Sequence, residues 1–233
     1  MVVPKLRISI SKYSVIRLMG ITMGVLVLTW TLHYRGGLAL FSDNKPLIFN
    51  VHPVLMVISL VLLNGEALLA YKAVPGTKRF KKLIHLSLQL MALFLAVIGV
   101  WAVWKFHSEK GVDHLYTLHS WLGLACLLLF TIQCAAGFTT FWYPGGSRNN
   151  RASLLPWHVF FGVYIYALAI ATAVTGFLEK ATFLQRSHII TRYSTEALLV
   201  NTMGILTMVL SGCVVLALVA PLDDSSVIPR TAK

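Results

Sequence analysis

The chain has 233 residues, of which 57% are hydrophobic and 12% are charged, and its mean hydropathy is +0.76. This balance excludes a soluble globular domain of the same size and indicates an integral membrane protein. The formal net charge is +12. The basic residues are scattered between apolar runs, however, which argues against a nucleic-acid partner and for contact with a lipid bilayer.

Six apolar runs are long enough to cross a hydrocarbon core of ~30 Å, which takes about 20 helical residues. Lipid cannot satisfy free backbone N–H and C=O groups, so we expect these runs to be helices. The expected fold is a single all-α transmembrane domain, 1–233, with a polar tail, 223–233, that we expect to be disordered on the cytosolic side. In chain order, the spans cover about 15–34, 52–71, 84–104, 116–141, 156–178 and 197–220.

Proline and glycine mark the ends of these runs. Gly36-Gly37 follows the first run and Pro75-Gly76 follows the second. Proline is tolerated in the first turn of a helix, so Pro53 is expected in the opening turn of the second helix. By the same reasoning, Pro156 is expected to open the fifth helix.

The distribution of basic residues predicts the orientation of the chain. Lys and Arg in short loops are retained on the cytosolic side of a membrane. Of the 20 Lys and Arg residues, 13 fall on the face that holds the N-terminus and seven fall on the other face. Both termini are therefore expected to be cytosolic.

Four histidines stand near the beginning of the four middle runs, namely His52, His85, His119 and His158. Because these runs alternate in direction, His52 and His119 share one depth, and His85 and His158 share the other. Each histidine taken singly fits an interfacial residue that bonds a backbone carbonyl, but four at matching depths favour two ligand pairs. A non-haem metal would need three or four ligands at one depth.

Bis-histidine ligation of haem leaves no open iron position, which suits one-electron transfer. The sequence lacks C-x-x-C-H, so any haem is expected to be non-covalent and b-type. The central four-helix bundle is thus expected to hold two haem groups about 20 Å apart.

Other polar and small residues have two interpretations each. Gly123 and Gly162 lie one turn after His119 and His158, where they suit either a flat macrocycle or ordinary helix packing. Glu66 lies 14 residues after His52, close to the same helical face. We expect this carboxylate to pair with a cation or a donor, and a role in proton movement is the alternative.

Basic and aromatic residues gather at both mouths of the predicted bundle. On the cytosolic side Lys78 and Lys82 are spaced i, i+4, and Arg151 approaches from the fourth loop, which suits an anionic electron donor. Positive-inside retention explains the same charges. On the opposite side His107 directly follows Phe106, in a rim that suits a small anion or a plain aromatic belt.

Two short segments resemble the cytochrome b561 family. Residues 117–121, TLHSW, are similar to the family's SLHSW, and residues 67–72, ALLAYK, resemble its ALLVYR. Together with the four histidines, the resemblance covers essentially the whole chain and indicates the plant-like transmembrane ascorbate-dependent ferrireductases. The second segment continues Ala73-Val74-Pro75 and so lacks the family's following basic residue.

The resemblance implies a homodimer of six-helix protomers, each with two haem b groups. We expect a vacuolar membrane or another endomembrane, with the plasma membrane as the alternative. The cytosolic haem would lie between His85 and His158, and the other between His52 and His119. Electrons would pass from cytosolic ascorbate to monodehydroascorbate or a ferric chelate on the opposite side. The residues implied for ascorbate are Lys78, Lys82 and Arg151. Those implied for the opposite substrate site are Phe106, His107 and Tyr116.

Two other functions compete with this interpretation. A quinol-linked cytochrome b would need a lipid-accessible pocket. A membrane transporter or proton channel would use polar residues inside the spans as its pathway. The candidates for such a pathway are Glu66, Gln89, Gln133 and Asn201.

Overall fold

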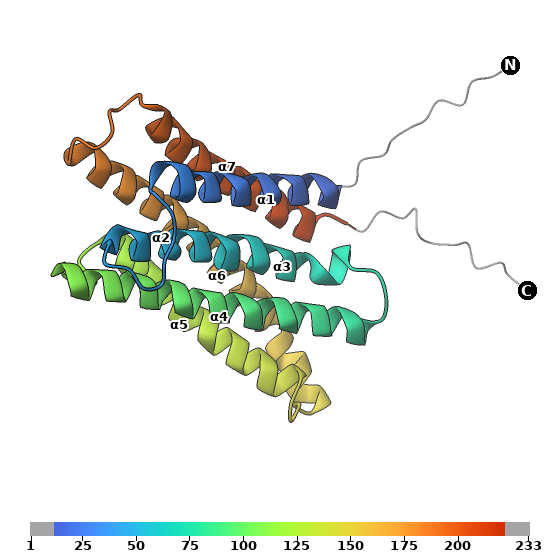
Figure 1. Ribbon diagram of the computed structural model, residues 1–233. Helices are drawn as coiled ribbons and strands as arrows, with labels where there is room; N and C mark the ends of the chain where they lie inside the picture. Colours follow the sequence, from blue (N-terminus) through green and yellow to red (C-terminus); the bar gives the residue numbers. More distant parts are fainter. Residues whose placement is uncertain (1–11, 222–233) are drawn as a thin grey trace, which may run out of the picture.

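The computed structural model describes residues 12–221, and within this range the chain forms six helical rods that are long and apolar enough to cross a membrane (Figure 1). This confirms the prediction of an all-α membrane protein with six spans. Two rods contain short π-helical segments, η1 and η2. In chain order, the helices are α1 (Lys12–Thr29) with η1 (Trp30–Tyr34), α2 (Lys45–Met56) with η2 (Val57–Leu63) and α3 (Asn64–Ala73), α4 (Lys78–Lys110), α5 (Leu118–Phe141), α6 (Arg148–Arg186) and α7 (Thr195–Val219). The predicted tail 223–233 lies outside the described residues.

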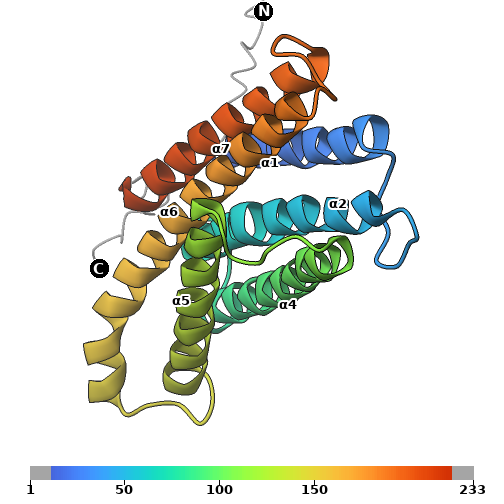
Figure 2. The ribbon, with the colours of Figure 1, turned by 90° about the vertical axis from the view of Figure 1, so that its left-hand side faces the viewer.

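The rods run in alternating directions, so helix ends gather at two faces. We call the face that holds Lys12 and Val219 the terminal face, and the face that holds Tyr34 and Thr195 the distal face (Figure 1). The α2–α3 rod packs along α4, and α5 packs along α6. Helices α1 and α7 pack against each other on the outside of this four-rod bundle, as Figure 2 shows.

Small residues let the central rods approach closely. The buried positions of α4 are Ala92, Ala96, Gly99 and Ala102, all on one face. A Cβ atom at Gly99 would lie 3.3 Å from the Cβ of Leu55 on α2, so the two backbones are nearly in contact there. Such small-residue faces are the usual way in which helices pack in a membrane.

Helices α2, α4 and α6 each begin six to eight residues before the predicted span, and in two of them this changes the position of a proline. Helix α2 starts at Lys45 and α6 at Arg148, so Pro53 and Pro156 both lie inside helices. The Ser147 hydroxyl accepts a hydrogen bond from the backbone N–H of Asn150 at 3.1 Å, which starts α6 well before its apolar run. A proline removes only one backbone hydrogen bond. A long helix can continue through it, and the polar residues outside the apolar run carry the helix into the interface.

Candidate functional site

The structure brings the four histidines together in the two predicted pairs. The ring centroids of His52 and His119 are 6.1 Å apart with an interplanar angle of 86°. Those of His85 and His158 are also 6.1 Å apart, with an angle of 71°. The first pair lies toward the distal face and the second toward the terminal face.

This separation fits an iron held between two imidazoles. Each bond from the metal to an imidazole nitrogen is about 2 Å long, and each ring centroid lies about 1 Å beyond that nitrogen. The two ring centroids would therefore be about 6 Å apart. Within residues 12–221, no group of three or more His, Cys, Asp or Glu side chains lies close enough to hold a metal ion. Each level thus presents two histidines, which is the number of side-chain ligands that bis-histidine haem requires.

Backbone carbonyls orient three of the four rings. Nδ1 of His52 lies 3.1 Å from the carbonyl oxygen of Gly99, and Nδ1 of His85 lies 2.8 Å from that of Ala67. Nδ1 of His119 lies 2.9 Å from the carbonyl oxygen of Thr172. A carbonyl can only accept, so each Nδ1 carries the proton and Nε2 is left free as a metal ligand.

Two glycines lie directly against the rings of His119 and His158, where a larger residue would collide with the ring. A Cβ atom at Gly137 on α5 would lie 2.8 Å from Cε1 of His158, and one at Gly176 on α6 would lie 2.6 Å from Cε1 of His119. The sequence analysis missed both glycines. The signal was present, because each glycine stands 18 residues after the histidine of its own helix, which is about five complete turns.

A cavity of about 500 Å³ surrounds the His85–His158 pair. This volume lies in the range of cofactor and ligand sites, which is about 300–1,000 Å³. Gly162 lines the cavity, one turn after His158, which supports the macrocycle interpretation at this position. Gly123 instead lies against the Thr172 methyl group, 3.5 Å from where its Cβ would be, which is ordinary helix packing.

The cavity reaches the terminal face beside basic and aromatic side chains. Lys82 and Arg151 line it, as does Lys72, which the sequence analysis did not select. The Lys82 ammonium donates to the carbonyl oxygen of Phe141 at 2.6 Å and lies 5.5 Å from the ring centroid of Trp142. Lys78 is not one of the described residues that line the cavity. It is exposed in the first turn of α4.

Of the three residues predicted for the distal substrate site, Phe106 lies near the His52 ring, whereas His107 and Tyr116 lie nearer the surface. The Phe106 ring lies 5.2 Å from that of Phe49, which in turn lies 6.2 Å from the ring of His52. His107 lies farther out, where its Nδ1 donates to the carbonyl oxygen of Asp113 at 3.1 Å. Tyr116, in the loop before α5, is 54% exposed.

The phenol of Tyr116 is held in its neutral form. Partial burial of the hydroxyl raises its pKa, and the negative charges of Glu179 and Asp113 raise the pKa further. Loss of the proton would place a third negative charge among these groups. Tyr116 is thus a hydrogen-bond donor at the distal surface.

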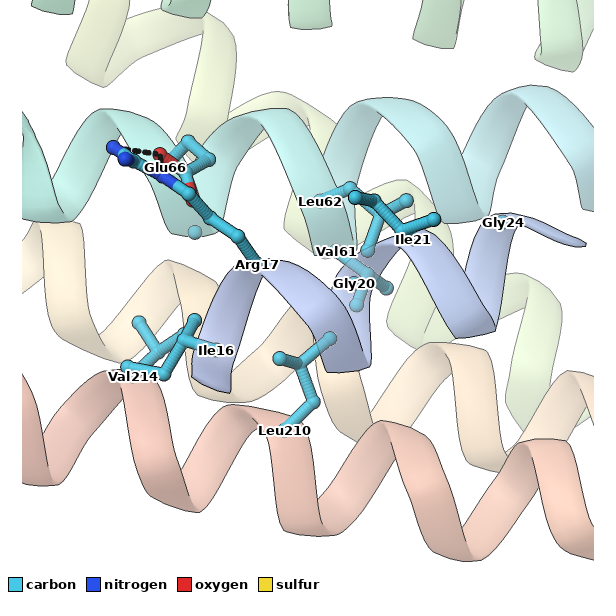
Figure 3. A pocket seen from close by; sticks show the side chains of 11 residues that line it. Ile16, Arg17, Gly20, Ile21, Gly24, Val61, Leu62, Glu66, Leu210 and Val214 are labelled. Carbon is cyan, nitrogen blue, oxygen red and sulfur yellow. Dashed lines mark hydrogen bonds and ion pairs between the residues drawn. The ribbon is translucent and has the colours of Figure 1, made fainter. Parts of the chain in front are cut away.

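Glu66 does not share a face with the histidines. The seven residues of η2 form i→i+5 hydrogen bonds and so turn fewer degrees per residue than an α-helix, which shifts the register between His52 and Glu66. Glu66 instead points toward Arg17 of α1, with Nη2 and Oε2 3.3 Å apart (Figure 3). The predicted pairing with a cation is confirmed, and the predicted face is wrong.

The Arg17–Glu66 pair closes one end of an apolar groove of about 340 Å³ between α1, α3 and α7 (Figure 3). The quinol alternative requires a pocket of this kind. The groove lies on the other side of α3 from the histidine cavity, since Gly65 and Glu66 line the groove while Asn64 and Leu68 line the cavity.

The remaining transporter candidates do not form a pathway. Gln89 donates to the Asn64 side chain at 3.1 Å, and Gln133 donates to the carbonyl oxygen of His158 at 2.6 Å, so both belong to the histidine cavity. Asn201 lies on the exposed face of α7. These three side chains thus lie in two separate places.

Comparison with known proteins identifies relatives of the chain. The chain is 66% identical over 211 residues to transmembrane ascorbate ferrireductase 2 of Arabidopsis thaliana, covering 91% of this chain and 92% of that protein. It is 47% identical over 204 residues to the probable ascorbate-specific transmembrane electron transporter 2 of Oryza sativa subsp. japonica, covering 87% and 86%. It is also 37% identical over 199 residues to a transmembrane ascorbate-dependent reductase of Pongo abelii, covering 85% and 78%.

Residues 51–184, which hold all four paired histidines, match the family of eukaryotic cytochrome b561. The resemblance found in the two short segments is therefore confirmed over most of the chain. By both the family match and its relatives, the chain belongs to the eukaryotic cytochrome b561 family.

Proposed function

We propose that the protein is a transmembrane oxidoreductase that carries single electrons from cytosolic ascorbate to monodehydroascorbate or a ferric chelate on the opposite side. The observation that carries this proposal is the presence of two histidine pairs of the same 6.1 Å separation, one toward each face. The names of the relatives, which are ascorbate ferrireductases and ascorbate-specific electron transporters, support the donor and one acceptor.

Each pair would hold one haem b, with His85 and His158 toward the cytosol and His52 and His119 toward the other side. Haem b bound between two imidazoles supplies reversible one-electron chemistry without an open iron position. The protein's part is to orient the four Nε2 atoms, which the carbonyl oxygens of Ala67, Gly99 and Thr172 do for three of them.

The bundle sets the distance between the two levels and keeps water out. On α4, 14 residues separate His85 from Gly99, whose carbonyl oxygen bonds His52, and this corresponds to about 21 Å of helix. Buried apolar residues of the central rods, including Leu60, Ala96 and Phe130, fill the interval. Such an apolar interior is unfavourable for a charge, so protons and ions are not expected to cross with the electron.

On the terminal face, Lys82 and Arg151 would bind the ascorbate anion at the mouth of the cavity, with Lys78 farther out and Lys72 as an additional cation. The excess of basic residues on this face supports its placement in the cytosol. On the distal face, Phe106, His107 and Tyr116 would form the acceptor site, where the neutral Tyr116 phenol donates a hydrogen bond. A homodimer in a vacuolar or other endomembrane completes the proposal.

Vectorial reduction in proteoliposomes tests this function. Purified protein is reconstituted with ferric citrate trapped inside, ascorbate is added outside, and the α-band of the haem and the ferrous iron are followed together. We expect two b-type haems per chain, reduction by ascorbate, and ferrous iron inside the vesicles. A colourless protein, or haem that ascorbate does not reduce, would refute the proposal.

A further inference from the structure

Lys180 lies one turn outside the distal histidine pair. It follows Gly176, the glycine that packs on the His119 ring, by four residues and so lies on the same face of α6. Its ammonium nitrogen is 4.0 Å from the ring centroid of Phe49. Phe49 in turn precedes His52 by three residues, one turn nearer the distal face.

Among the described residues, the half-buried Lys180 ammonium group has an aromatic partner but no carboxylate within salt-bridge distance. Within residues 12–221, Lys180 forms no salt bridge. Two charges act on Lys180, namely Arg35 and Glu196, and these two side chains are paired with each other; the Glu196 carboxylate also accepts the Trp30 Nε1–H at 2.9 Å. A partly buried cation at the edge of a membrane span without a counter-ion is unfavourable, which makes Lys180 a candidate functional residue.

The terminal pair has the same arrangement with the two residue types exchanged. There, Lys82 precedes His85 by three residues, and Phe141 follows by four residues the glycine that packs on His158. Lys82 and Phe141 are in contact through the 2.6 Å hydrogen bond, as Lys180 and Phe49 are through the ring. Each histidine pair thus has one lysine and one phenylalanine in the turn just outside it.

We propose that Lys180 is the distal counterpart of Lys82 and binds a carboxylate-type anion at the outer edge of the His52–His119 pair. The anion is either a propionate of the haem held there or the anionic acceptor itself, both of which present carboxylate or similar oxygens to an ammonium group. The Phe49 ring holds the ammonium in place by its cation–π contact. The negative charge of Glu179, which acts on Tyr116, directs the anion to the Lys180 side of the mouth. This inference rests on the proposed function.

The test compares Lys180→Met, Lys180→Arg and Lys110→Met in proteoliposomes. Lys110 is exposed at the distal end of α4, so its variant removes the same charge from the same face. Two acceptors are used, anionic ferric citrate and cationic hexaammineruthenium(III). The midpoint potential of each haem is titrated separately with dithionite and mediators, so that this readout does not depend on ascorbate. Haem content per chain reports folding.

If the anion bound by Lys180 is the free acceptor, Lys180→Met should raise the KM for ferric citrate about tenfold and leave the KM for hexaammineruthenium(III) unchanged. If the anion is a haem propionate, Lys180→Met should lower the midpoint potential of the distal haem, because a nearby positive charge favours the reduced haem. The KM values for the two acceptors should then change equally. Lys180→Arg should retain wild-type values in either case. If Lys180→Met matches Lys110→Met in KM and in both potentials, the inference is wrong. Failure of ascorbate to reduce the wild type would refute the proposed function but would leave the potential titration to decide on Lys180.

Discussion

The clearance between Gly176 and His119 gives the sharpest prediction. In Gly176→Ala, the new Cβ would lie 2.6 Å from Cε1 and 2.9 Å from Nδ1 of His119. Carbon atoms in contact are normally about 3.5–4.0 Å apart, so the ring must move by about 1 Å. The 2.9 Å hydrogen bond from Nδ1 to the carbonyl oxygen of Thr172 opposes this movement. Losing that bond costs about 1 kcal/mol, and misplaced outer-shell partners typically weaken metal affinity about 10- to 100-fold.

The assay is haem content per chain by pyridine haemochrome, followed by dithionite-reduced spectra. We expect Gly176→Ala to fall from two haems per chain toward one, with the distal haem lost selectively. The matched control is Gly204→Ala on α7, because a Cβ at Gly204 would meet no atom within 4 Å. That variant should keep both haems and gain up to about 1 kcal/mol of stability from the better helix former. Two haems of unchanged potential in Gly176→Ala would refute the clearance argument.

Four further outcomes are expected. His85→Ala should remove the terminal-face haem and abolish reduction by ascorbate, and a fully reducible variant would contradict the pairing. Lys82→Met should keep both haems and raise the KM for ascorbate about tenfold, since it removes one charge-assisted hydrogen bond; an unchanged KM would return Lys82 to a purely topological role. Tyr116→Phe should slow acceptor reduction equally at pH 6 and pH 8, because the raised pKa keeps the wild-type phenol protonated beyond its ordinary value of 10.0. Glu66→Gln should leave electron transfer unchanged and, because the Arg17–Glu66 pair is partly exposed, cost under about 1 kcal/mol in thermal unfolding; a slowed rate would indicate proton transfer.

The number of spans and the depth of each histidine in the membrane could be predicted from the sequence. Six spans follow from apolar length alone, and alternation of direction then pairs His52 with His119 and His85 with His158. Neither step depends on the exact rotation of a helix. Both need only depth, which tolerates errors of a few residues because each residue adds just 1.5 Å.

Features that depend on rotation could not be predicted in the same way. An α-helical period extended across residues 57–63 predicts that Glu66 shares the His52 face, but the chain is π-helical there. Nothing in that apolar stretch signals the change of period. The contact of Lys180 with Phe49 likewise joins side chains 131 residues apart on different rods, and only the packed bundle shows it.

The spacing of histidine and glycine on α5 and α6 links cofactor clearance to the distance between the two sites. An interval of 18 residues is five complete turns, so the histidine and glycine of each helix face the same way. Because α5 and α6 pack side by side in opposite directions, each glycine meets the histidine of the other helix. This interval corresponds to about 27 Å of helix along α5 and α6, whereas the two levels are about 21 Å of helix apart along α4. Insertion of one residue between the histidine and the glycine of one helix would rotate that glycine by about 100° away from its histidine, so this interval ties the room for each ring to the spacing of the two histidine levels along α5 and α6.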